Sequence, residues 1–302
     1  MKILTILFVL TNFLILISGC GESPINIDEK TYSPKIVVEG YLFPGQKVEN
    51  IRITRNFPLD REIELSEILI TDAEVRLWDV ENAKSYTLNY SPLRFSYEYN
   101  GSDLVIDFGK AYQIEITATV DNQKLYTTST TRVPQKGFKI DDSKSSLYPL
   151  TYREKDRSGK IKSFVIAFQK SPETNFYVLS IVALDASQST FIEDNSYGIK
   201  TDDLDDRMLD GLKYQYKWVE AVFEGFTIYY VDVPWVEIWF HGRYRVILYA
   251  GDKNFKDYFL THNRIQDIDG NLYEPKFHFE GDGIGVFGSA ITDTTFFEVQ
   301  KN

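Results

Sequence analysis

The feature that most constrains the fold is an alternation of apolar and polar residues that recurs between about Lys35 and Pro134. Side chains of an extended strand point alternately to opposite faces, so this pattern predicts strands with one buried face. Turn residues separate the runs, and together they predict about eight short strands. The runs are Ile36–Val38, Ile51–Ile53, Ala73–Leu77, Tyr86–Tyr90, Phe95–Tyr99, Leu104–Phe108, Tyr112–Ile116 and Tyr126–Thr130.

Short strands with frequent turns favour a β-sandwich over residues 35–136, either immunoglobulin-like or transthyretin-like. The turn signals include Asn100-Gly101 and Asp121-Asn122. A helical alternative fails, because no window holds apolar residues at helical spacing and because β-branched and aromatic residues dominate.

A polar stretch from Gln135 to about Arg157 predicts a boundary, and residues 137–302 are expected to form a second, mainly β domain. Two domains are the usual solution for a chain of this length. Asp252 predicts the start of one helix, and a weaker pattern predicts a second between Asp202 and Leu212. The expected strands are Phe164–Phe168, Phe176–Ile181, Phe226–Val231 and Val236–Phe240.

The N-terminus has the three parts of a lipoprotein signal peptide over residues 1–19: a basic start, a short apolar run and small residues before a cysteine. Ile17-Ser18-Gly19-Cys20 is similar to the bacterial lipobox, which predicts lipidation of Cys20 and attachment of the mature chain to a membrane by its acyl chains. Residues 20–34 are expected to form a tether between the lipid and the folded part of the chain. A cleaved secretory peptide and an uncleaved anchor are the alternatives.

Composition narrows the classes of partner. The chain is 15% aromatic and 25% charged, which is typical of a folded globular body. Its formal net charge is −11, and removal of Lys2 with the signal peptide lowers this to −12. Nucleic acid is therefore a poor partner. Cys20 is the only cysteine, so no disulfide and no thiolate site is expected in the body.

Two acidic segments could hold calcium, which prefers carboxylate and carbonyl oxygens. These are Asp202–Asp206 and Asp267–Asn271, and a solvated loop or turn is the favoured interpretation of each. No histidines are spaced as zinc ligands, so neither a metal nor a cofactor is expected. The sequence has no Gly-x-Ser-x-Gly motif, and no catalytic residue is predicted. A pair of carboxylates that meet only in the fold stays open as a hydrolytic site.

Aromatic residues supply the candidates for binding, because Tyr and Trp are enriched at interfaces and stack on sugars. The run from Tyr214 to Trp218 holds three of them. Packing within strands is the competing interpretation. The candidate binding residues are Trp218, Tyr229, Tyr230, Trp235 and Trp239.

Near the C-terminus, glycines at positions 281, 283, 285 and 288 interleave with Ile284, Val286 and Phe287. This spacing predicts a strand and turn in close contact with neighbouring backbone. The pattern Gly-x-Gly-x-x-Gly also occurs there, but no helix pattern follows it, so a dinucleotide site is not expected.

Three segments together resemble the Bacteroidota lipoproteins grouped as domain of unknown function 4249. They are Ile36–Tyr41, Ala73–Leu77 and the segment from Tyr273 to Gly288. The resemblance implies an outer-membrane lipoprotein, often encoded beside a TonB-dependent receptor. No catalytic residues carry over from the family.

From these features we expect a non-enzymatic, lipid-anchored protein that faces the cell exterior and assists a TonB-dependent transporter in nutrient capture. The ligand is not specified by the sequence. A structural, envelope-assembly or adhesion module is one alternative, and a surface hydrolase is another. A location on the periplasmic face of the outer membrane is the alternative to surface exposure.

Overall fold

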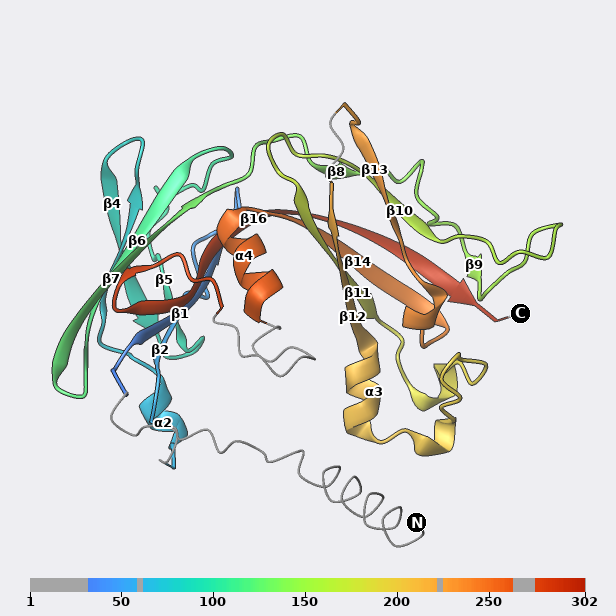
Figure 1. Ribbon diagram of the computed structural model, residues 1–302, viewed down its shortest axis with the longest axis horizontal. Helices are drawn as coiled ribbons and strands as arrows, with labels where there is room; N and C mark the ends of the chain where they lie inside the picture. The colour runs from blue at the N-terminus through green and yellow to red at the C-terminus, as the bar shows by residue number, and fades with distance from the viewer. Residues whose placement is uncertain (1–31, 59–61, 222–224, 263–274, 302) are drawn as a thin grey trace, which may run out of the picture. The chain divides into compact units, whose positions relative to one another are not determined.

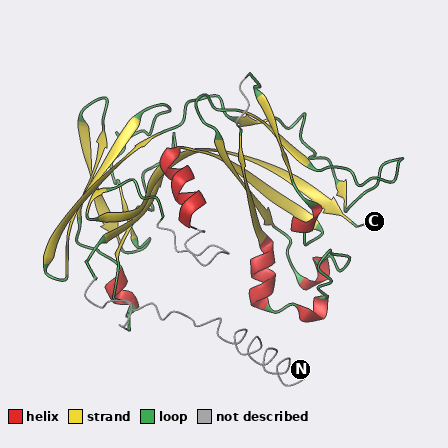
Figure 2. Ribbon diagram, in the orientation of Figure 1, coloured by secondary structure: helices red, strands yellow, loops and turns green. Residues whose placement is uncertain are grey.

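The computed structural model describes residues 32–58, 62–221, 225–262 and 275–301. The predicted signal peptide, Cys20 and most of the tether lie outside these residues. The described part is mainly β, with three sheets and a few short helices, which confirms the predicted fold class (Figures 1 and 2). None of its helices combines the length and the apolarity that crossing a bilayer requires. The helices are α2 (Leu65–Ile68), α3 (Asp206–Lys213) and α4 (Lys253–His262), with single 3₁₀ turns η2 (Gln188–Thr190), η3 (Thr201–Asp203) and η4 (Trp235–Glu237).

A seven-stranded sheet organises the molecule, with strand order β12-β11-β14-β16-β1-β2 and β9 beside the end of β16. Its longest strand, β16, pairs with β1 in parallel through its first half and with β14 antiparallel through its second half. The strands are β1 (Ile36–Leu42), β2 (Arg52–Arg55), β9 (Leu150–Thr151), β11 (Phe176–Ala183), β12 (Tyr214–Glu220), β14 (Gly242–Gly251) and β16 (Gly283–Gln300).

Two smaller sheets complete the described fold. A six-stranded sheet has the order β15-β7-β6-β3-β4-β5, and a three-stranded sheet has the order β13-β10-β8. The strands are β3 (Glu74–Asp79), β4 (Lys84–Ser91), β5 (Ser96–Glu98), β6 (Ala111–Val120), β7 (Gln123–Arg132), β8 (Lys139–Ile140), β10 (Val165–Gln169), β13 (Ile228–Asp232) and β15 (Glu280–Gly281).

Two hydrophobic cores lie on one face of the seven-stranded sheet. The first lies between the six-stranded sheet and the β1–β2 end, and the second between the three-stranded sheet and β11, β14 and β16. Phe287 of β16 belongs to the first core, whereas Ile291, Phe297 and Val299 of the same strand belong to the second. The cores change over between Val133 and Phe138, near the predicted boundary. Independent folding of residues 35–136 stays a prediction.

The glycine-rich segment forms the predicted strand and turn. A Cβ atom on Gly285 would lie 2.1 Å from the carbonyl oxygen of Val38, and one on Gly281 would lie 2.4 Å from that of Tyr126. Both glycines also have positive φ angles, which side chains disfavour. The close approach lets β16 pair with β1 and β15 pair with β7.

Two predicted strands are wrong. Residues 104–108 form an extended loop, in which Ile106 is buried while its carbonyl accepts from the Gly45 amide and Val105 accepts from the Tyr112 hydroxyl. The segment thus satisfies its polar backbone without a ladder. Residues 236–240 overlap η4, which Pro234 precedes, and only Phe240 makes an isolated bridge.

A candidate binding face

The helix α4 lies on the face of the seven-stranded sheet opposite the two cores, and Asp252 caps it as predicted. The Asp252 carboxylate accepts hydrogen bonds from the amides of Phe255 (2.9 Å) and Ser289 (3.2 Å) and from the Thr131 hydroxyl (2.6 Å). Burial raises the pKa of Asp252, and these hydrogen bonds offset the effect only in part. One carboxylate therefore joins α4, β7 and β16.

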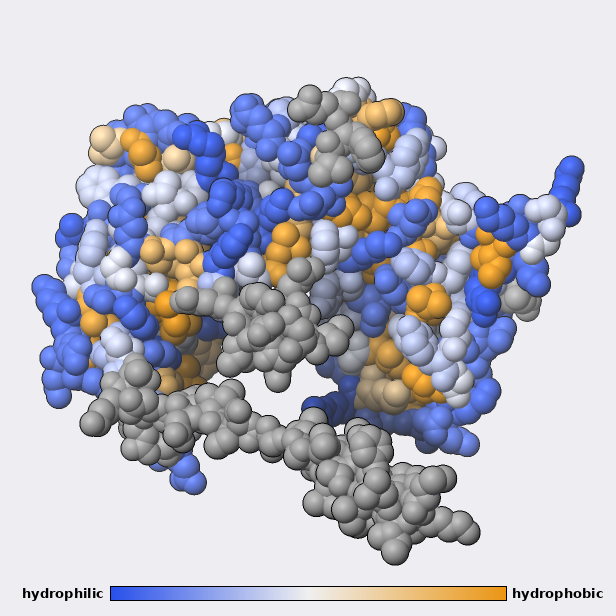
Figure 3. Space-filling view, viewed as in Figure 1, coloured by the Kyte–Doolittle hydropathy of each residue, from blue (hydrophilic) through white to orange (hydrophobic). Residues whose placement is uncertain are grey.

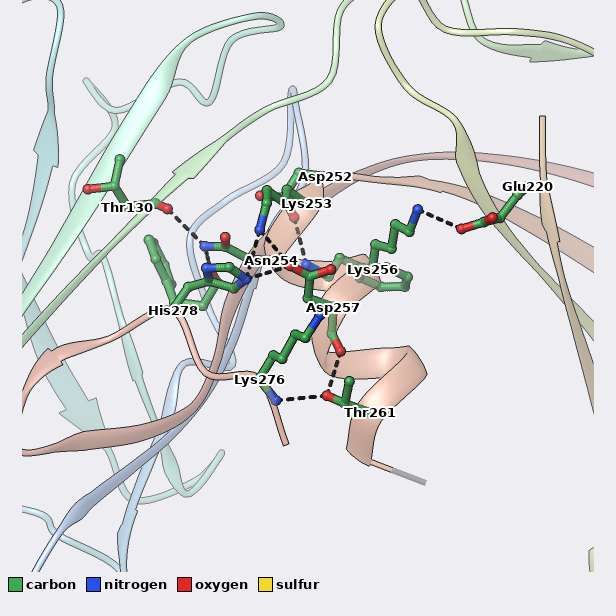
Figure 4. A network of polar contacts seen from close by, with 12 residues as sticks. Thr130, Glu220, Asp252, Lys253, Asn254, Lys256, Asp257, Thr261, Lys276 and His278 are labelled. Atoms are coloured by element: carbon green, nitrogen blue, oxygen red, sulfur yellow. Dashed lines mark hydrogen bonds and ion pairs between the residues drawn. The ribbon is translucent and has the colours of Figure 1, made fainter. Parts of the chain in front are cut away.

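Two further side chains fix the position of α4 (Figure 4). The Asn254 amide nitrogen donates to the carbonyls of Thr130 and Phe287, both at 2.8 Å. The ammonium group of Lys256 lies 2.5 Å from the Glu220 carboxylate at the end of β12. The helix is thus tied to β7, β16 and β12.

Asp257 links α4 to the segment before β15. Its carboxylate lies 2.6 Å from the ammonium group of Lys253 and 2.9 Å from the His278 ring. Burial opposes ionisation, but the contacts with Lys253 and His278 prevail and lower the pKa of Asp257. The Asp257–His278 contact therefore positions the segment before β15 against α4.

Aromatic rings fill the space between α4 and the sheet. Phe255 and Phe259 on α4 lie 6.2 and 5.7 Å from Phe176 on β11, measured between ring centroids. At the β12 end, the Tyr216 ring meets Phe259 edge-on at 5.8 Å, and Trp218 lies 6.2 Å from Phe176. The helix therefore covers one part of this face, and its aromatic packing continues onto β12.

Beyond α4 the face is open. Tyr214, Tyr216 and Trp218 alternate along β12 and are 52, 61 and 41% exposed, and Phe296 on β16 is 57% exposed. On the side of the molecule drawn in Figure 3, residues of high hydropathy (orange) are interspersed with hydrophilic ones (blue) rather than gathered in one patch. Large exposed aromatic side chains that share one sheet face are typical of an interaction surface. We call Tyr214, Tyr216, Trp218 and Phe296 the open aromatic face.

Arg245 lies within this face. The strand register places it beside Val182 on β11 and beside Phe296 on β16. Its Nε atom is buried and has no hydrogen-bond partner among the described residues. A buried, unsatisfied donor is uncommon and costs free energy.

The structure separates the five predicted binding residues. Trp218 belongs to the open aromatic face, and Tyr230 is exposed on β13 of the three-stranded sheet. Trp239 is buried between the rings of Phe191 and Tyr197. Tyr229 and Trp235 are half-buried and pack on the second core. Packing thus accounts for the environment of these last three.

Sequence reasoning gave no role to Phe296 or Arg245, because their proximity to β12 depends on pairings between distant strands. Tyr214 and Tyr216 were noticed only as parts of an aromatic run. Their alternation with Gln215 and Lys217 was the signal that they share a face with Trp218.

The acidic segments fall into two cases. Asp202 and Asp203 lie in η3, and Asp205 caps α3 by accepting from the Met208 amide at 2.7 Å. The segment Asp267–Asn271 lies outside the described residues. Within the described ranges, no group of three His, Cys, Asp or Glu side chains is arranged to hold a metal ion.

A cavity of about 450 Å³ lies beside the start of α4. Three cationic residues line it, but each has a carboxylate partner: Lys256 with Glu220, Lys253 with Asp257, and Arg132 with Glu81. The cavity therefore offers an anion little free positive charge, and the open aromatic face is the stronger candidate for binding.

Comparison with solved structures finds distant similarity to several proteins. The tetra-tandem repeat in the extending region of a large adhesion protein matches with a TM-score of 0.23 and 10% identity, covering 89% of this chain and 50% of that one. A bacterial ice-binding adhesin matches with a TM-score of 0.21 and 12% identity, and the match covers 89% of this chain and 65% of the adhesin chain. The FN1–FN3 domains of chicken CNTN1 match with a TM-score of 0.18 and 11% identity, and the match covers 88% of this chain and 67% of the CNTN1 chain. These scores carry no argument about function.

Comparison with curated proteins finds no match. A family model does match, over residues 22–295, which include every strand up to the second half of β16. The chain therefore belongs to the family described as domain of unknown function DUF4249.

Proposed function

We propose that this chain is a non-enzymatic lipoprotein of a Bacteroidota outer membrane that binds a TonB-dependent transporter at the cell surface and assists nutrient capture. The observation that carries the binding role is the open aromatic face. The lipid anchor rests on the lipobox-like sequence ending at Cys20, and the transporter partner rests on the family resemblance.

Two considerations support binding, one from the structure and one from the predicted anchor. The three aromatic residues of β12 are displayed on a strand that is paired along β11, so they are held in place before a partner arrives. Ordering costs on binding are lower for such preorganised side chains. A lipid anchor and a tether would confine the chain to the membrane surface and raise its effective concentration near a membrane partner.

The test is purification of the tagged chain from detergent-solubilised outer membranes. We expect a stoichiometric β-barrel transporter to co-purify, and we expect Tyr216→Ala with Trp218→Ala to remove it. Tyr148→Ala is the matched control, because Tyr148 is also exposed but lies outside the open aromatic face. Recovery of the chain without a transporter, or equal recovery with all variants, would contradict the proposal.

The anchor has a separate test. Cys20→Ser should release the chain from the membrane fraction without changing its circular dichroism spectrum. A variant that stays in the membrane pellet in cells lacking the transporter would show that another feature holds it there. Protease treatment of intact cells would then report orientation, since the polar segment from Asp141 to Arg157 should be cleaved only in a surface-facing protein.

A further inference from the structure

We propose that β12 accepts an extended strand from a protein partner, antiparallel to itself, and that this strand carries lysine or arginine at the end next to α3. The inference rests on the proposed function in assuming a protein partner. It adds the mode of recognition, in which main-chain hydrogen bonds extend the seven-stranded sheet.

The hydrogen-bond pattern shows which backbone groups are available. The Ala221 amide donates to the Asn175 carbonyl at 2.8 Å, and the β11–β12 register continues this pairing along the strand. Residues alternate between bonding one neighbour and the other, so Gln215, Lys217 and Val219 bond β11. The amides and carbonyls of the even-numbered residues from Tyr214 to Glu220 therefore point to the outer edge. Among the described residues, no backbone hydrogen bond from a turn, loop or cap reaches Tyr216 or Trp218, whereas the Tyr214 amide lies at the end of α3.

The other sheet edges are shorter. Proteins commonly limit unwanted pairing by keeping edge strands very short. At the ends of the three sheets β15 and β8 have two residues each, β5 has three, β2 has four and β13 has five, whereas β12 has seven. The strand also has no proline and a continuous register. It is therefore the longest of these edges and lacks the protection that shortness or proline would give.

The same residues present side chains to a partner. Tyr214, Tyr216 and Trp218 point their backbone groups to the outer edge and their exposed rings to the open aromatic face. An added strand would place alternate side chains beside these rings on that face. Apolar residues at every second position of the partner strand would therefore be favoured.

Charge specifies the end next to α3. Five exposed aspartates lie in η3, at the start of α3 and in its second turn, where a strand that continued past Tyr214 along α3 would meet them, and the cations of this segment are Lys200, Arg207 and Lys213. Lys213 lies over the Tyr214 ring, 5.3 Å from its centroid. The local excess is negative, so a basic strand end is complementary. The aspartates are Asp202, Asp203, Asp205, Asp206 and Asp210.

A synthetic peptide tests the edge without the transporter. The probe is a capped peptide of alternating threonine and valine that ends in lysines at its C-terminus, which an antiparallel strand would place near α3. Amide exchange of the mature chain, followed by NMR, should show protection of the Tyr216 and Trp218 amides when the peptide is added. A peptide with glutamates in place of the lysines should bind at least about tenfold more weakly.

Variants at position 216 separate the contribution of the backbone amide to peptide binding from that of the side chain. Tyr216→Pro removes one outward amide and spares the ladder to β11, and it should weaken peptide binding by about tenfold or more relative to Tyr216→Thr. Thermal unfolding of both variants checks that they fold, and Trp218→Pro with Trp218→Thr repeats the comparison at an independent position.

Each outcome decides the question. Peptide protection that proline abolishes supports the edge, even when no transporter co-purifies. Absence of protection at saturating peptide, equal binding of proline and threonine variants, or preference for the acidic peptide would overturn it. A dimer in sedimentation that Tyr216→Pro dissociates, without peptide binding, would assign the edge to a second copy and also overturn it.

Discussion

The two ends of the seven-stranded sheet differ in how their edges are treated. At the β2 end, Thr54 bridges to Leu69 and Ile51 bridges to Tyr97, so neighbouring segments cover the edge. The Tyr97 hydroxyl donates to the Ile70 carbonyl at 3.0 Å and accepts from the Ala73 amide at 2.8 Å. At the β12 end, the described residues leave the edge uncovered and display three aromatic side chains.

The two ends of the sheet therefore differ in how far their aromatic side chains are buried. The β2 end uses buried aromatic and apolar side chains to complete the first core. The β12 end keeps its aromatic side chains about half exposed, although Tyr216 and Trp218 also contact the rings of Phe259 and Phe176. Their exposure on an ordered strand is the feature on which the proposed binding role rests.

The largest expected effect is at the junction of β16 and β1. Gly285→Val should destabilise the fold by about 3 kcal/mol or more, because the new side chain would overlap the Val38 carbonyl at a positive φ angle. Gly45→Ala is the control, since Gly45 also has a positive φ but has open space around it, and it should cost about 1 kcal/mol. Urea unfolding gives both values. Equal losses would show that backbone conformation alone determines the cost.

Asp252→Ala should cost about 2 kcal/mol, since it removes the cap of α4 and leaves the Ser289 amide and the Thr131 hydroxyl without this partner. Asp252→Asn should cost less, because its side-chain oxygen still accepts from the amides. Urea unfolding that ranks the two variants equally would contradict the assigned role of the carboxylate.

Tyr97→Phe tests the β2 end of the seven-stranded sheet, which we call the closed end because neighbouring segments cover its edge. It should cost about 1–2 kcal/mol, because the Ile70 carbonyl and the Ala73 amide lose their partner. Tyr216→Phe at the open end should change stability by less than about 0.5 kcal/mol. If the two substitutions cost the same in urea unfolding, the two ends do not differ in structural role.

The pH dependence of Asp252 provides a smaller test. Its pKa is raised in the folded state, so the folded chain binds the proton more tightly than the unfolded chain does. The unfolding free energy of the wild type, relative to Asp252→Asn, should fall as the pH rises from the ordinary carboxyl value near 3.8 through the folded value. A difference that rises with pH over this window would contradict the assigned shift.

The last stability prediction concerns the open aromatic face. Tyr216→Ala with Trp218→Ala should lower the unfolding free energy by about 1–2 kcal/mol through loss of the ring contacts with Phe259 and Phe176, and the chain should stay folded. It should nevertheless remove transporter co-purification. Loss of folding in this variant would mean that the rings serve packing, as Trp239 does between Phe191 and Tyr197.

Local pattern accounts for much of the fold. The alternation from Tyr112 onward predicted β6 and β7, and Asp121-Asn122 forms the turn between them with both residues at positive φ. Asp252 predicted the start of α4. These features depend on residues close together in the chain, where periodicity and turn chemistry are informative.

Long-range pairing escaped prediction. The parallel pairing of β16 with β1 joins Ile36 to Gly283, and nothing in either segment specifies the other. Apolar and polar residues alternate over residues 104–108 as in a strand. The Tyr112 hydroxyl nevertheless bonds the Val105 carbonyl and the Asp107 amide, so the segment forms a loop. The open aromatic face likewise required the pairing of β12, β11, β14 and β16 before Phe296 and Arg245 could be placed.

The most direct test of the contrast between the two ends is photo-crosslinking in intact cells. A photoreactive phenylalanine analogue at position 216 samples the open end, and the same group at position 95, where Phe95 is exposed between β4 and β5, samples the closed end. We predict crosslinks to a membrane partner from position 216 and none from position 95. Crosslinks from position 95 alone, or equally from both positions, would contradict the account.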